Sequence, residues 1–141
     1  MTRYLLDTNI ISNMVKPEPS PALAAWLLEQ HASDLFVASW TMAEIRRGIL
    51  CMPQGRRRDR LEEWFSGPRG PAAMFAGRIL PFDEQAAEIW AALVAEGYRT
   101  GRPRSEPDMI VAATALVNAC MIVTHNVRDF EGVAPILNPM R

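Results

Sequence analysis

The chain has 141 residues, of which 49% are hydrophobic, and this is enough for one domain with a buried core. We therefore expect a single domain over residues 1–141. Fifteen basic and sixteen acidic residues give a net charge of −1, which excludes a strong overall positive field. Apolar runs fall short of the roughly 18–20 residues of a membrane span, and the N-terminus lacks a signal-peptide pattern. We expect a cytoplasmic protein without membrane contact.

Cysteine and arginine usage narrows the possibilities further. Cys51 and Cys120 form no CxxC or Cys/His spacing, which argues against a disulfide framework and a structural zinc site. The cations are fourteen arginines and Lys16, and the densest group is Arg56–Arg58 with Arg60. Guanidinium groups suit phosphate binding, but such a run also fits a solvated helix face, and both interpretations stay open.

Short apolar runs alternate with longer helical patterns along the chain. The runs predict strands at residues 4–6, 35–38, 78–80, 121–123 and 135–137. The helical patterns cover residues 9–14, 21–30, 41–52, 56–66, 71–76, 84–99 and 107–118. Buried strands separated by helices form parallel sheets with helices on both faces. The sequence therefore predicts an α/β sandwich.

Acidic and amide side chains stand where such a sheet binds ligands, beyond the carboxyl ends of its strands. Asp7 follows the first predicted strand directly, and Asn126 and Asp129 follow the fourth. Glu44 and Asp108 fall in the first turns of predicted helices, from which side chains can also reach this edge. The pattern predicts a cluster of acids.

Each acid also has a purely structural explanation. Thr41–Glu44 and Ser105–Asp108 fit the capping box, in which the acid satisfies amides at a helix start. Asp7 fits an ordinary helix N-cap, and residues 124–126 fit an Asx turn. Any single acid is explained in this way, whereas the ordered set favours a shared site.

Converging carboxylates need a counter-charge, because two like charges about 4 Å apart cost roughly 4 kcal/mol at an effective dielectric constant of 20. Mg²⁺ or Mn²⁺ supplies it, and such ions promote phosphodiester hydrolysis. GxGxxG, P-loop and GxSxG motifs are missing from the sequence, and His31 is isolated. A phospho-receiver domain needs a late lysine, whereas Lys16 is early.

The motifs at residues 6–12, 43–48, 107–115 and 124–130 together resemble PIN-domain toxins of the VapC type. Residues 75–83 are similar to the FitB branch, and the resemblance runs from about residue 4 to residue 139. It implies a PIN-like three-layer α/β/α sandwich with a mostly parallel central sheet. It also implies a homodimeric Mg²⁺- or Mn²⁺-dependent endoribonuclease acting on RNA. The implied partner is a VapB-like antitoxin that covers the active-site groove and carries the only contact with operator DNA.

The same resemblance assigns roles to individual residues. The metal-binding acids are Asp7, Glu44 and Asp108. The residues expected to support them through hydrogen bonds are Thr8, Asn9, Ser12 and Thr124.

One position departs from many relatives, which have Asp where this chain has Asn126. An amide oxygen is a weaker metal ligand than a carboxylate, and Asp129 shares a helical face with Asn126 if that segment is helical. Either residue completes the catalytic set. Arg46, Arg47 and His125 are the candidates for contact with the substrate.

Two further points stay open from the sequence. Surplus apolar residues on the second and third helices suggest that Trp26 or Trp40 borders the antitoxin groove. Asn126 also favours an alternative function, a catalytically weak PIN domain that acts as a binding partner in an antitoxin–operator complex. A third possibility is a structure-selective DNA nuclease, which the small size of the chain argues against.

Overall fold

The computed structural model describes residues 1–140, and within them the strands form one five-stranded sheet with every neighbouring pair parallel. The sheet order is β3-β2-β1-β4-β5. The strands are β1 Arg3–Leu6, β2 Leu35–Ala38, β3 Ile79–Leu80, β4 Cys120–Val123 and β5 Ile136–Leu137. All five strands match the predicted runs to within one residue at each end, and the predicted parallel pairing is confirmed.

The helices lie close to their predicted positions. They are α1 Thr8–Met14, α2 Pro21–Leu28, α3 Ser39–Leu50, α4 Arg56–Ser66, α5 Pro71–Met74, α6 Glu84–Arg99 and α7 Glu106–Val117. Two short 3₁₀ helices, η1 Ala32–Asp34 and η2 Val127–Phe130, were not predicted. Within residues 1–140 no helix is both long and apolar enough to cross a bilayer.

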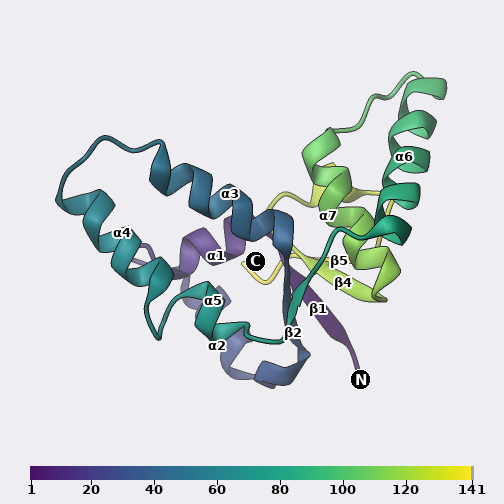
Figure 1. The fold of residues 1–141 in the computed structure, drawn as a ribbon. Coiled ribbons are helices and arrows are strands. Elements are labelled where there is room, and N and C mark those ends of the chain that lie inside the picture. The colour runs from purple at the N-terminus through teal and green to yellow at the C-terminus, as the bar shows by residue number, and fades with distance from the viewer. Residues whose placement is uncertain (141) are drawn as a thin grey trace.

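Successive residues of each strand point to opposite faces of the sheet, and this alternation builds two cores. Leu5 packs with α7 in one core, and Leu6 packs with α1, α2, α3 and Phe75, the C-cap of α5, in the other. Figure 1 shows the result: α6 and α7 cover one face of the sheet, and the first five helices cover the other. The predicted three-layer α/β/α sandwich is confirmed.

The parallel sheet brings the carboxyl ends of its strands to one edge. In the register of β1 and β4, Leu6 lies opposite Val123, so the next residues, Asp7 and Thr124, are neighbours. The Asp7 N–H donates to the Val123 carbonyl at 2.9 Å, which extends the pairing by one step. Strand β2 leads directly into α3 at the same edge, because Ala38 is both the last strand residue and the N-cap of the helix.

Helices α3 and α4 form an arm that extends from the sheet, on the left in Figure 1. The chain turns from α4 into α5 at Gly70, whose backbone passes close to the end of α4. A Cβ atom at this position would lie 2.0 Å from the Trp64 carbonyl oxygen and 2.5 Å from that of Phe65. Only glycine permits this approach, so Gly70 fixes how α4 lies against the rest of the molecule.

A pair of glycine substitutions tests this account. We expect Gly70→Ala to lower the free energy of unfolding by about 2 kcal/mol or more, because backbone atoms must move to admit the new methyl group. Gly48→Ala, inside α3 with open space around its Cβ position, is the control and should raise stability by about 0.5–1 kcal/mol. Urea unfolding measures both values. Equal effects in the two variants would contradict the close approach at Gly70.

Candidate active site

Asp7 is the most strongly held acid of the predicted cluster. Its side chain is buried and caps α1, with Oδ1 accepting from the Thr8 N–H at 2.9 Å. Its other oxygen, Oδ2, accepts from Thr124 Oγ1 at 2.9 Å and from Asn9 Nδ2 at 3.1 Å. The N-cap interpretation of Asp7 is therefore confirmed, and the cap stands at the edge of the sheet among the other acids.

The pKa of Asp7 is raised from its ordinary value by burial, while hydrogen bonds from Thr8, Thr124 and Asn9 lower it again. The negative charge of Glu44 raises the pKa further. Asp7 thus combines a desolvated carboxylate with donors that stabilise its ionised form.

Thr124 and Asn9 tie the loop after β4 to the start of α1. The Thr124 hydroxyl accepts from Asn9 Nδ2 at 3.2 Å and from the Asn126 N–H at 3.0 Å. The Asn9 carbonyl oxygen in turn accepts from the His125 N–H at 2.9 Å. Asn9 therefore links Asp7, Thr124 and the backbone of the following loop.

Glu44 reaches the site from α3, where Thr8 Oγ1 donates to Glu44 Oε1 at 2.7 Å. The capping-box interpretation of this acid is wrong. The helix begins at Ser39, so Thr41 lies inside it, fully buried. Among the described residues Thr41 Oγ1 has no hydrogen-bond partner. Since Glu44 is not needed at the helix start, its carboxylate is available to the site.

Asp108 stands in the first turn of α7, where the Ser105 hydroxyl accepts from its N–H at 3.3 Å. Ser105 is thus the N-cap, as the sequence predicted. The pKa of Asp108 is raised from 3.8 to about 6, mainly by burial, against a lowering hydrogen bond from Ser105. The charges of Asp129, Asp7 and Glu44 add to the rise. Carboxylates from four separate segments therefore share one electrostatic environment.

Asn126 is the N-cap of η2 and Asp129 lies within it, and both are exposed. The Asp129 N–H donates to the Asn126 carbonyl at 3.2 Å, and residues three apart in a 3₁₀ helix eclipse one another. The condition that this segment be helical is met. The charge of Asp129 acts on Asp108 together with those of Asp7 and Glu44, so Asp129 brings a fourth negative charge to the site.

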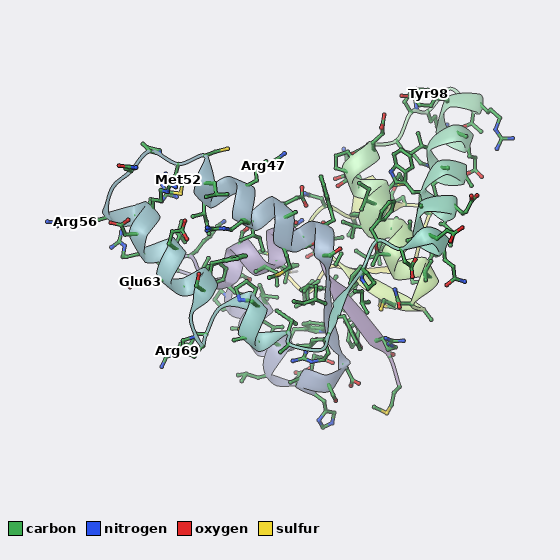
Figure 2. The ribbon with its side chains drawn as sticks, in the orientation of Figure 1. Arg47, Met52, Arg56, Glu63, Arg69 and Tyr98 are labelled. Atoms are coloured by element: carbon green, nitrogen blue, oxygen red, sulfur yellow. The ribbon has the colours of Figure 1, made fainter. Side chains whose placement is uncertain are left out.

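The three substrate candidates take different positions. Arg46 pairs with Glu62 at 2.6 Å and lies over the Phe65 ring, so it joins α3 to α4 and is not directed at the acids. Arg47 is exposed on the outer side of α3 (Figure 2). His125 is exposed in the loop beside Asn9. The structure places the His125 backbone beside the site through its bond to Asn9, and leaves the two arginines away from it.

A hollow of about 730 Å³ extends from Thr8 and Glu44 between α1, α3 and α4. Ser12 lies on its wall, one turn of α1 beyond Thr8. The tryptophan that lines this hollow is Trp64, on α4. This hollow, from here on the α4 groove, is the depression that adjoins the acids on the α3 side.

Trp26 and Trp40 do not line this groove, and whether either borders the antitoxin stays a prediction. Trp26 packs edge-on against Tyr4 at 5.0 Å between ring centroids, and Trp40 packs against the core on the α7 side. The sequence reasoning missed Trp64, although residues 57, 60, 61 and 64 have the spacing of one helix face. The many charged residues of α4 obscure this spacing in the sequence.

The donor set fits a hard divalent cation. Carboxylate oxygens are the ligands that Mg²⁺ and Mn²⁺ prefer, and after burial the negative charges of Asp129, Asp7 and Glu44 contribute to the raised pKa of Asp108. Across residues 1–140 no three His, Cys, Asp or Glu side chains form a closed ligand group. Mg²⁺ is often bound through one or two carboxylates and keeps several waters, so a closed group is not required.

Comparison with known proteins agrees with this geometry. Residues 4–134 match the PIN domain, and the chain belongs to the PIN-domain family. It is 38% identical to VapC ribonuclease Y4jK of Sinorhizobium fredii and 34% identical to toxin FitB of Neisseria gonorrhoeae, over 96% of both chains in each comparison.

Solved structures extend the likeness to three dimensions. FitAcB from Neisseria gonorrhoeae is similar with a TM-score of 0.86 and 32% identity, over 96% of this chain and 97% of the other. A structure of FitAB bound to an IR36 DNA fragment gives a TM-score of 0.88, with 32% identity over 98% and 96% of the two chains.

The Thr124 hydroxyl provides a test of how Asp7 is held. We expect Thr124→Val to lower the free energy of unfolding by about 2 kcal/mol, because it removes the donor to Asp7 and the acceptor for Asn9 and Asn126. It should also weaken Mn²⁺ binding, measured by calorimetry, by about tenfold. Thr114→Val is the control, since Thr114 is buried in α7 and its hydroxyl bonds only the Ile110 carbonyl. Equal Mn²⁺ affinity in the two variants would contradict the role of Thr124.

The raised pKa of Asp108 predicts a pH-dependent stability in the presence of a chelator. Between pH 3.8 and about 6 the unfolded chain loses this proton while the folded chain keeps it, so stability falls as the pH rises through this range. Asp108→Asn removes the effect. Because the side chain is only partly buried, we expect the variant to be more stable than the parent by about 1 kcal/mol at neutral pH. Below pH 3.8 the parent and the variant should have equal free energies of unfolding. A difference between them that does not change with pH, measured by urea unfolding, would refute the raised pKa.

Proposed function

We propose that this chain is the toxin of a type II toxin–antitoxin pair and a divalent-metal-dependent endoribonuclease, acting as a single PIN domain. The observation that carries the proposal is the convergence of acids: Thr8 bonds both Asp7 and Glu44, and the charges of Asp129, Asp7 and Glu44 all act on Asp108 in α7. Relatives named VapC ribonuclease and toxin FitB, similar over the whole chain, support the same activity.

The residues of this chain position the acids before any substrate binds. Thr124, Asn9 and the Thr8 N–H hold Asp7, and the Thr8 hydroxyl holds Glu44. Thr8 is thus bonded to two acids through two different groups, which fixes the start of α1 relative to α3. Such fixed hydrogen bonds keep catalytic groups close to a productive geometry.

Mg²⁺ or Mn²⁺ held by Asp7, Glu44 and Asp108 would activate a water for attack on phosphorus and offset the charge that develops on the phosphoryl oxygens. Asn126 or Asp129 completes the set, and the charge that Asp129 exerts on Asp108 favours Asp129. Hydrolysis in this manner leaves 5′-phosphate and 3′-hydroxyl ends on the RNA.

The proposed partner is a VapB-like antitoxin that covers the groove beside the acids. FitAB bound to a DNA fragment, a complex of a similar chain, supports contact with operator DNA through the antitoxin. We further propose that the protein forms a homodimer and acts in the cytoplasm, where RNA and operator are both present.

The central experiment compares two acid-to-amide variants. We expect Asp108→Asn to abolish RNA cleavage in Mn²⁺ while the protein stays folded. The loss should exceed the roughly 100-fold that removing an outer hydrogen-bond partner costs. Asp59→Asn, which makes the same change on an exposed face of α4, is the control and should cleave like the parent. Digestion of total RNA by purified protein measures both.

The opposite result has a definite meaning. Asn126 lacks the charge that many relatives carry at this position, and this favours the second candidate function, a catalytically weak PIN domain in an antitoxin–operator complex. A parent protein that cuts no RNA and binds no Mn²⁺ in the millimolar range would replace the ribonuclease with this candidate. Cleavage of DNA in preference to RNA would contradict both.

A further inference from the structure

The segment between α6 and α7, residues 100–105, leads directly into the helix turn that carries Asp108. We call it the α6–α7 loop. It joins two helices that lie side by side (Figure 1). Its last residue, Ser105, is the N-cap of α7, and the Ser105 hydroxyl accepts from the Asp108 N–H at 3.3 Å. The place where this loop ends therefore sets where Asp108 stands.

Arg104, the residue before this cap, ties the loop to α6 by two hydrogen bonds. Its Nη1 donates to the Leu93 carbonyl at 2.8 Å, and its Nη2 donates to Glu96 Oε1 at 2.8 Å. The hydrogen bond and the charge of Arg104 lower the pKa of Glu96. A planar guanidinium with two partners has a fixed direction. Ser105 follows Arg104 in the chain, so the cap is held as well.

The backbone of the α6–α7 loop also lies tightly against the last turns of α6. The Arg102 N–H donates to the Gly97 carbonyl at 2.9 Å, and the Thr100 hydroxyl donates to the Glu96 carbonyl at 2.9 Å. A Cβ atom at the buried Gly97 would lie 2.9 Å from the Arg102 carbonyl oxygen and 3.1 Å from the Arg104 nitrogen. The loop therefore has little freedom to move relative to α6.

Helix α6 carries none of the four acids of the site, yet it holds the helix start at which Asp108 enters. Besides the loop contacts, Trp90 Nε1 of α6 donates to the Glu106 carbonyl, in the first turn of α7, at 3.0 Å. Asp7 and Glu44 are positioned differently, because Thr8 bonds both of them within the site. The contacts with α6 supply the corresponding support on the α7 side.

We propose that Arg104, through its bonds to the Leu93 carbonyl and Glu96, is a positioning residue that sets the start of α7 and so places Asp108 for metal binding. These bonds are called the α6 clasp below. The proposal rests on the metal-dependent ribonuclease function proposed above. A misplacement of about 1 Å caused far from the reacting atoms can cost on the order of 100-fold in rate. The clasp acts on the position of Asp108 and leaves its chemistry unchanged.

The experiment compares Arg104→Gln with Arg78→Gln. Arg78 also donates to main-chain carbonyls, those of Leu35 and Met74, but Leu35 begins β2 and so lies at the edge of the sheet away from the acids. We expect Arg104→Gln to weaken Mn²⁺ binding, measured by calorimetry, by about tenfold. It should also lower kcat for RNA cleavage by about tenfold with little change in KM. Arg78→Gln should change neither quantity.

A second variant and a second measurement make the test independent of a single substitution and of the metal. Gly97→Ala keeps every partner of Arg104 but pushes the loop away from α6, so it should also weaken Mn²⁺ binding. The N–H groups of Asp108 and Met109 both bond Ser105. Their hydrogen exchange, measured without metal, should be faster relative to the rest of α7 in Arg104→Gln and Gly97→Ala, and unchanged in Arg78→Gln.

The outcomes separate the clasp from the activity. Equal Mn²⁺ affinity and equal exchange in Arg104→Gln and Arg78→Gln would overturn the clasp. A raised KM with unchanged kcat in Arg104→Gln would also overturn it, because it would place Arg104 in direct contact with the substrate. A parent protein that neither binds Mn²⁺ nor cuts RNA would instead refute the proposed function. Hydrogen exchange at the start of α7 would still decide whether the clasp exists.

Discussion

The hydrogen bond from Thr124 to Asp7 is the contact on which the site depends, because it joins the ends of the two central strands. Burying a carboxylate is costly unless hydrogen-bond donors surround it. The parallel register of β1 and β4 places Thr124, one of these donors, directly beside Asp7. Asn9 then extends the same network to the loop after β4. The two sheet strands and α1 therefore place Asp7 rigidly, and the acids on α3 and α7 come to it.

A chain with almost no net charge nevertheless separates its charges in space. The carboxylates of Glu44, Asp108 and Asp129 act on one edge of the sheet, and Lys16, Arg57 and Arg60 border the groove beside it. The first group favours a bound cation, in keeping with the metal-assisted hydrolysis of phosphodiesters proposed above. Net charge alone conceals this arrangement, because the two groups cancel in the sum.

The elements and their order were predictable because short apolar runs and helix periodicity are local properties. Strand β2 and helices α4 and α6 were predicted to the residue, whereas α3 begins two residues before its prediction. That error had a cause in the fold: Ala38 ends a buried strand and starts the helix without a capping side chain, so Thr41 only resembles a cap. Because Thr41 was interpreted as the cap, Glu44 was assigned a capping role that it does not have.

By itself, the sequence determined the strand and helix order, the residue types at the strand ends and, through resemblance of its motifs, the PIN-domain family. Only the tertiary structure decided which side chains meet, because contacts such as Thr8 to Glu44 and Thr124 to Asp7 join residues far apart in the chain. It also turned Arg57 and Arg60 into the groove, Arg56 outward and Arg46 toward Glu62. Neighbouring arginines look alike in a sequence, and the direction that each takes depends on how α4 packs against α3.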